Sequence, residues 1–186
     1  MLWIVVGVVV VVALGAVVVY NRLVSLRQSV SNAQGDIDVQ LRQRADLVPQ
    51  LVETVKGYAA HEAGVLEALT KARTAVTQAA TPEQKMAAEG GLSRAIGGLF
   101  AVAEAYPDLK ASVNFQTLQT QLMDIEDKIA AARRFLNTSV SEYNASIQQV
   151  PAVFFARSMG FEPARFYDLP EDRAAEMQEP VKVSFK

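Results

Sequence analysis

The sequence predicts an all-α protein, in which an N-terminal transmembrane helix continues into an antiparallel domain of long helices, of four-helix-bundle type. Three observations support this fold class. One uninterrupted apolar run opens the chain, apolar residues then recur at spacings of three and four, and strand-like patterning is confined to residues 181–185. Because long helices with short connections pack as antiparallel neighbours, a bundle is the simplest arrangement.

Charged residues are distributed unevenly along the 186-residue chain. They make up 20% of the sequence and the net charge is −2, yet none precedes Arg22. The residues after 21 therefore have the composition of an ordinary soluble domain, and no later segment is apolar for long enough to span a bilayer. The acidic balance disfavours nucleic-acid binding, and the absence of cysteine excludes disulfides, thiolate metal sites and a cysteine nucleophile.

The apolar run is typical of a membrane anchor. Leu2 to Tyr20 are 19 uncharged residues, of which 17 are apolar. As a helix they extend about 28 Å, close to the hydrocarbon thickness of a bilayer. Trp3 and Tyr20 stand where interfacial aromatic residues are expected. A cleaved signal peptide needs a basic region before the apolar core, and none is present here, so residues 1–21 are predicted to be an uncleaved anchor.

The charges that flank the apolar run predict its orientation. Arg22 and Arg27 follow it, and no basic side chain precedes it. The positive-inside rule then places the N-terminus outside and the rest of the chain in the cytoplasm. Near a membrane surface, the same two arginines could also bind anionic headgroups.

Helical periodicity accounts for most of the remaining sequence. A first stripe is interpreted as one element of about 50 residues with a kink at Pro49. Its members are Leu23, Leu26, Val30, Ala33, Ile37, Leu41, Val48, Leu51, Val55, Tyr58, Val65, Leu69 and Val76. A second helix is expected from about Pro82 to Ala105, because Thr81-Pro82-Glu83-Gln84 has the residues of a capping box. Tyr106-Pro107-Asp108 marks the next boundary.

The third helix has the most regular pattern, with apolar residues at three- and four-residue spacing from Phe115 to Val150. Its apolar seam is longer than the second helix, so part of it is expected to need another subunit. Pro151 ends this helix, and residues 153–161 are predicted to form a final helix that folds back as a cap. The bundle domain is thus residues 22–161, followed by an extended or mobile tail over residues 162–186 that is rich in charge and proline.

No catalytic, cofactor or metal site is predicted. His61 and Glu62 lack the spacing of a metal motif, and Asp46, Glu53 and His61 are too far apart along a helix to hold one small ligand. The glycine pairs at 90–91 and 97–98 lack the strand and the Lys-Ser or Lys-Thr of a phosphate loop. A mixed-charge cluster of Asp36, Asp38, Arg42, Arg44 and Asp46 is interpreted as side-chain pairing along the helix, with a subunit contact as the alternative.

Several segments also resemble the LemA family over residues 20–167. The segments that carry this resemblance are 20–27, 37–41, 44–62, 106–111, Phe115, 118–119, Glu126, 129–130, 132–133, 143–144 and 160–161. Two departures are Gln34-Gly35, where a bulky residue is expected, and Phe135-Leu136-Asn137, which replaces a Tyr-Asn pairing. The resemblance implies a bacterial membrane protein with one N-terminal span, an exterior N-terminus and a cytoplasmic helical domain. Some members are associated with the organisation of internal membranes.

These observations predict a non-enzymatic, single-pass protein of the bacterial inner membrane that acts through contacts. The leading hypothesis is self-assembly into a membrane-attached oligomeric scaffold, with the lipid bilayer and further copies of the chain as partners. Aromatic residues near the end of the bundle motivate it as well: Phe154, Phe155, Phe161, Phe166 and Tyr167. The alternative is a monomeric anchored adaptor that presents a helical face to a membrane-protein client or senses a small ligand between its helices.

Overall fold

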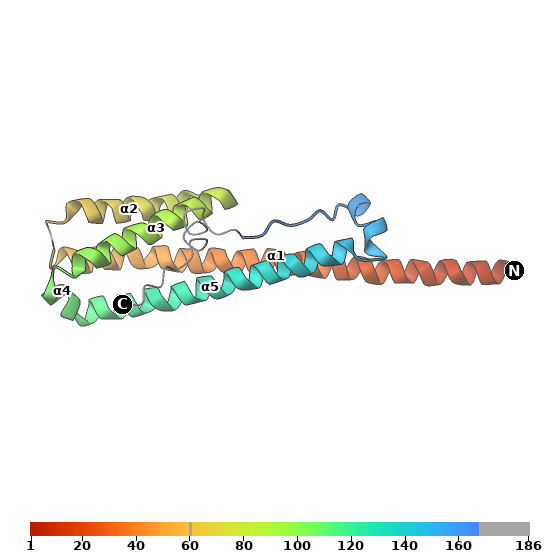
Figure 1. The fold of residues 1–186 in the computed structure, drawn as a ribbon, viewed down its shortest axis with the longest axis horizontal. Coiled ribbons are helices and arrows are strands. Elements are labelled where there is room, and N and C mark those ends of the chain that lie inside the picture. Colours follow the sequence, from red (N-terminus) through yellow and green to blue (C-terminus); the bar gives the residue numbers. More distant parts are fainter. Residues whose placement is uncertain (60, 168–186) are drawn as a thin grey trace, which may run out of the picture. The chain divides into compact units, whose positions relative to one another are not determined.

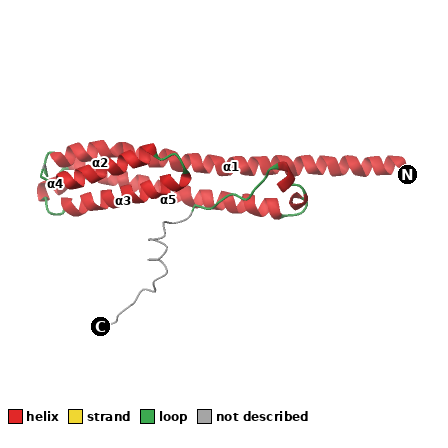
Figure 2. Cartoon of the chain, turned by 90° about the horizontal axis from the view of Figure 1, so that it is seen from above, coloured by secondary structure: helices red, strands yellow, loops and turns green. Residues whose placement is uncertain are grey.

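The chain forms seven helical elements within residues 1–59 and 61–167, the part described by this computed structural model (Figure 1). In order these are α1 (Leu2–Lys56), α2 (Ala63–Gln78), α3 (Pro82–Ala103), α4 (Pro107–Ala111), α5 (Val113–Gln148) and two 3-10 helices, η1 (Ala152–Phe154) and η2 (Arg157–Met159). Figure 2 shows helices and loops but no strand in this part of the chain, which confirms the all-α fold class. The tail from residue 168 onward, with the strand-like residues 181–185, lies outside the described residues.

Helix α1 joins the apolar anchor segment to the amphipathic sequence that follows it. Its 55 residues continue without a break through Tyr20 and past Pro49, which lies inside the helix. The continuity of anchor and bundle helix, predicted from the absence of turn residues after Tyr20, is therefore confirmed.

The interpretation of residues 23–76 as a single element is wrong. Helix α1 ends at Lys56 and α2 begins at Ala63. Gly57, a poor helix former, follows the last helical residue. The amide groups of residues 58 and 59 both donate to the Val55 carbonyl, at 3.0 and 2.8 Å, so the chain turns here. The apolar stripe stays in phase across this connection, which is why periodicity alone did not reveal the break.

Residues 38–129 form one compact unit, which we call the bundle unit. Four helical segments surround its core: the C-terminal part of α1, then α2, α3 and the N-terminal part of α5. Figures 1 and 2 both show these segments running alongside one another. The fully buried leucines of the core are Leu51, Leu69, Leu92, Leu99 and Leu109. This arrangement is the helical bundle that the sequence predicts.

The predicted start of the second long helix is confirmed by its cap. The Thr81 side chain accepts a hydrogen bond from the Gln84 amide at 3.2 Å, and the Gln84 side chain accepts one from the Thr81 amide at 3.3 Å. This reciprocal pair satisfies two of the amide groups that a helix start leaves without partners. Helix α3 ends at Ala103, and α4, a five-residue helix that the sequence did not reveal, begins at Pro107 inside the predicted boundary at residues 106–108.

Residues 1–37 and 130–167 form the second compact unit, which we call the anchor unit. It contains the N-terminal part of α1, the C-terminal part of α5 and the 3-10 helices.

The apolar seam of α5 is buried within one chain. Nine of its large apolar residues are at most 8% exposed: Phe115, Leu118, Leu122, Ile125, Ile129, Leu136, Val140, Tyr143 and Ile147. The expectation that part of this seam needs another subunit is therefore wrong. Both units contain a part of α1 as well as a part of α5, so each unit covers its own portion of the seam.

The chain reverses direction after α5 through residues 149–161, which we call the tip segment. The predicted final helix over 153–161 is wrong, because these residues form the 3-10 helices η1 and η2 instead. Pro151 lacks an amide donor for a continuing helix. Gly160 ends η2 with a φ of 78°, in the left-handed region that favours glycine.

Residues 162–167 then run back along α5, held by two asparagines. The Asn144 side chain and the backbone of Ala164 exchange two hydrogen bonds, at 2.8 and 2.9 Å. Asn137 and the backbone of Tyr167 do the same, at 2.8 and 3.2 Å. The two asparagines are seven residues apart on a helix, and their partners Ala164 and Tyr167 are three residues apart in extended chain. Both separations correspond to about 10 Å, so the two pairs of hydrogen bonds can form side by side.

Candidate functional site: an exposed apolar segment of α1

The apolar segment of α1 is the most exposed apolar surface of the described chain. Its best 18-residue window has a mean hydropathy of 3.1 and none of it is buried. Among the described residues, α1 is the one helix long and apolar enough to cross a membrane. Side chains such as Trp3, Ile4 and Leu14 are more than half exposed, which is unfavourable in water and favourable in a hydrocarbon environment.

Within the bundle unit, a polar cluster lies between three helices. Arg44 of α1 is only 6% exposed. Its guanidinium forms an ion pair with Glu126 of α5 at 3.1 Å and donates a hydrogen bond to Ser93 of α3 at 3.0 Å. A buried cation requires such partners because burial removes its hydration. This cluster ties α1, α3 and α5 together inside the bundle unit.

In the mixed-charge cluster predicted around Arg44, two members make ion pairs with other helices. Arg44 is buried against other helices, and Asp38 pairs across to Lys85 of α3 at 2.6 Å. Asp36 is exposed on α1. The helix positions these side chains on different faces, since consecutive residues are turned by about 100°. The pairs found for Arg44 and Asp38 thus join different helices of one subunit, and pairing along the helix stays a prediction for the other members of the cluster.

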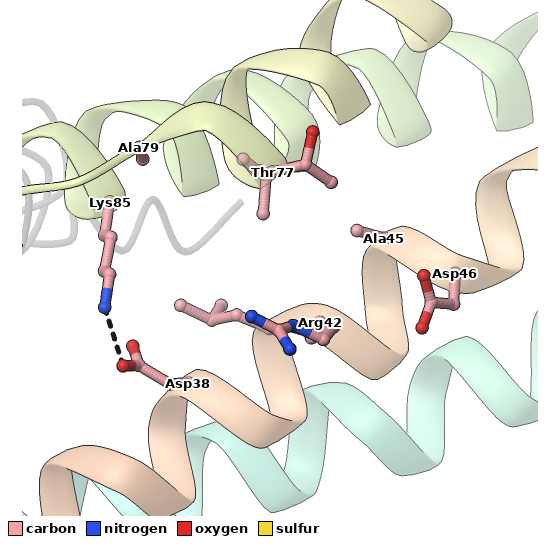
Figure 3. A pocket seen from close by; sticks show the side chains of 9 residues that line it. Asp38, Arg42, Ala45, Asp46, Thr77, Ala79 and Lys85 are labelled. Atoms are coloured by element: carbon pink, nitrogen blue, oxygen red, sulfur yellow. Dashed lines mark hydrogen bonds and ion pairs between the residues drawn. The ribbon is translucent and has the colours of Figure 1, made fainter.

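A charged groove of about 340 Å³ lies between α1, α2 and the start of α3 (Figure 3). Asp38, Arg42 and Asp46 line it from α1, and Lys85 lines it from α3. Figure 3 shows the Lys85 ammonium directed at the Asp38 carboxylate. The charges of two carboxylates and two cations cancel in this groove, so the groove has no strong preference for an anionic or a cationic ligand. No cluster of three or more metal-ligating side chains occurs among the described residues.

The polar residues near His61 make contacts that stabilise the fold. His61 lies exposed in the connection between α1 and α2, and Glu62 accepts a hydrogen bond from the Tyr106 hydroxyl at 2.9 Å. This hydrogen bond to a carboxylate raises the pKa of Tyr106. Glu53 pairs with Lys56 one turn away on α1, at 3.1 Å. The fold therefore does not gather His61, Asp46 and Glu53 into one site.

In the anchor unit, the aromatic residues near the end of the chain differ in their environments. Phe161 is buried and packs edge-on against Tyr20, with ring centroids 5.6 Å apart. The Arg133 guanidinium lies 5.1 Å from the centre of the Tyr167 ring. Phe154 and Phe166 remain exposed.

Tyr143 marks a groove of about 260 Å³ on the anchor unit. Arg27 and Glu162 also line this groove. Burial raises the pKa of Tyr143, Arg27 opposes that shift and Glu162 adds to it. The predicted headgroup ligands Arg22 and Arg27 are both exposed on α1 just after the apolar segment.

Sequence reasoning missed the two asparagines that fix residues 162–167. Asn137 and Asn144 are seven residues apart, so they lie on one face of α5. Asparagine is disfavoured in helix interiors, so two asparagines at this spacing indicate a role for their side-chain amides. That signal was present in the sequence.

The sequence matches the LemA family over residues 33–185. It is 25% identical over 174 aligned positions to "Magnetosome protein MamQ" of Magnetospirillum gryphiswaldense, and 27% identical to "Magnetosome protein MamQ 1" and "Magnetosome protein MamQ 2" of Paramagnetospirillum magneticum. Each alignment covers 80% of this chain and 64% of the relative, so the chain spans less than two thirds of these proteins. None of these names denotes an enzymatic activity. Because the family match covers most of the chain, this protein is a member of the LemA family.

Proposed function

We propose that this protein is a non-enzymatic, single-pass membrane protein whose helical domain self-assembles into a membrane-attached scaffold. The exposed apolar segment of α1 carries the proposal. It belongs to the same helix, α1, that continues into the bundle unit, so an anchor in the bilayer would tether that unit to the membrane. The relatives are named for magnetosomes, that is, for a cellular structure and not for a reaction, which fits a structural role.

The proposed orientation has the N-terminus outside and the helical domain in the cytoplasm of a bacterial cell, across the inner membrane. Arg22 and Arg27 support it, since both follow the span. The chain contains no cysteine, so single-cysteine labelling gives an unambiguous answer. In intact cells a membrane-impermeant maleimide should label Leu2→Cys and leave Ala68→Cys unlabelled until the cells are broken. The reverse pattern would invert the orientation.

Self-assembly is supported by apolar side chains that remain exposed on the bundle unit. Val39, Val113 and Met123 are each more than half exposed and could pack against a second copy. We expect the full-length chain, extracted in mild detergent, to run as a discrete particle of several chains. Met123→Glu should reduce its mass. Gln121→Glu, which adds the same charge at an exposed position two residues away, should not.

The second candidate is a monomeric anchored adaptor, and two observations favour it. The chain covers its own apolar seam, and the bundle unit presents the charged groove between α1, α2 and α3 to a client or ligand. A full-length particle with the mass of one chain would replace the scaffold by this adaptor. Mutation of the groove at Asp46 and Arg42 would then be the way to locate the client surface.

A further inference from the structure

The tip segment exposes an unusual set of apolar side chains. Phe154 is 79% exposed, Val150 74%, Met159 50% and Val153 46%. All four lie within ten residues of sequence, whereas the same segment buries Ala152 and Ala156. The segment thus buries two small residues together with Phe161 and leaves four large apolar side chains exposed. In water this is the reverse of what the hydrophobic effect favours.

The tip segment lies beside the end of the apolar span. Phe161, which closes the segment, packs on Tyr20, the last residue of the span. Ala16 and Val19 are the only residues between 2 and 20 that the structure partly covers, and both belong to this same end. Figures 1 and 2 both show the tip segment next to this stretch of α1, within the anchor unit.

We propose that the tip segment inserts its exposed side chains into the lipid bilayer, at the interface of the leaflet from which α1 emerges. The inference rests on the proposed function, in which Leu2–Tyr20 spans the membrane. Each interfacial layer of a bilayer is about 5–8 Å thick, which is half the difference between the full width of the bilayer and the width of its hydrocarbon core. A bilayer that holds Tyr20 at this level therefore also reaches the residues packed around it.

The chemistry of the tip segment suits this environment. Aromatic and aliphatic side chains of interfacial segments sink into the boundary between headgroups and acyl chains. Arg157 is exposed between Phe154 and Met159. Its aliphatic stem can lie along the apolar layer while the guanidinium stays at the level of the lipid phosphates. The partner is a lipid surface because the segment packs, through Phe161, on the end of the span within the anchor unit.

Tryptophan fluorescence in the full-length chain tests the proposal. In a Trp3→Phe background, which removes the one native tryptophan, a tryptophan is introduced by Phe154→Trp. The matched control is Phe135→Trp, an exposed phenylalanine of the same unit that lies 13 residues before the end of α5. Val10→Trp reports on the span itself. Each variant is reconstituted in vesicles of phosphatidylcholine and phosphatidylglycerol, with and without bromine-labelled lipid, and also exposed to acrylamide.

We expect bromolipids to quench most of the emission at positions 154 and 10 and little at 135, with acrylamide effective only at 135. If position 10 is quenched while position 154 is open to acrylamide and insensitive to bromolipid, the tip insertion is refuted and the anchor stands. If position 154 is shielded from both quenchers, protein covers the segment, as in a contact between copies, and the lipid proposal is overturned. If position 10 is not quenched, the proposed span and the tip insertion both fail.

Discussion

Replacement of the buried arginine by alanine should destabilise the bundle unit markedly. Arg44→Ala removes the ion pair with Glu126 and the hydrogen bond to Ser93. A hydrogen bond that involves a charged group contributes about 1.5–3 kcal/mol, and loss of one member of a buried ion pair costs about 3–5 kcal/mol. The Glu126 side chain is 38% exposed, so water screens its part of the pair and lowers this figure. We expect a net loss of about 2–4 kcal/mol in unfolding free energy.

The matched control lies two residues earlier on the same helix. Arg42 is exposed in the charged groove, so Arg42→Ala should change the unfolding free energy by less than about 0.5 kcal/mol. Thermal unfolding of both variants, as full-length chains in mild detergent, is measured by far-UV circular dichroism. For a chain of this size the Arg44→Ala loss corresponds to about 5–15 °C in Tm.

A double variant separates the ion pair from simple packing. In Arg44→Met with Glu126→Leu, apolar side chains of similar length replace both charges, and most of the lost stability should return. If Arg44→Ala and Arg42→Ala melt at the same temperature, the reasoning from burial and charge is wrong, because a solvated arginine and a buried one would then be equivalent.

Three further predictions concern single residues. Thr81→Ala removes the side-chain acceptor of the α3 capping box and should cost about 1 kcal/mol of stability, measurable by thermal unfolding. Gly160→Ala places a Cβ at a φ of 78° and should lower the unfolding free energy by about 1–2 kcal/mol. Gly35→Ala, inside α1 with open space around the added Cβ, should raise the unfolding free energy by up to about 1 kcal/mol. If both substitutions change stability in the same direction, the argument from backbone conformation is wrong. Because burial raises the pKa of the Tyr143 phenol, the folded state holds this proton more tightly than the unfolded state. Stability should therefore be constant for this group at neutral pH and fall as the pH rises above about 10, and melting curves of Tyr143→Phe should show a shallower fall.

Much of the fold could be predicted because local signals coincide with the tertiary structure. The Thr81-Pro82-Gln84 pattern fixes the start of α3 through hydrogen bonds made within four residues. The uncharged segment up to Tyr20 predicts a span because its length matches the hydrocarbon thickness. The break after Lys56 could not be predicted in this way. Periodicity shows only which face of a helix is apolar. A short connection after which the apolar residues continue at the same spacing does not change that pattern, so it cannot be detected from it.

The polar cluster shows a signal that was present and not used. The apolar stripe of α1 runs from Ile37 and Leu41 to Val48, and the position between them on the same face is Arg44 with Ala45. An arginine inside an apolar stripe indicates a buried cation that needs a carboxylate from another helix. The identity of that partner, Glu126, depends on how α5 packs against α1, and the sequence of α1 alone does not determine this packing.

The packing of Phe161 on Tyr20 has a mechanical consequence for a span held in lipid. A bare helix adapts to bilayers of different thickness by sliding along the membrane normal or by tilting. The bulky turn that packs on Tyr20 through Phe161 would resist sliding in one direction, because deeper insertion would drag the polar backbone of that turn into hydrocarbon. A span held in this way would be fixed in depth at its C-terminal end, and changes in bilayer thickness would be absorbed by tilt and at the Trp3 end.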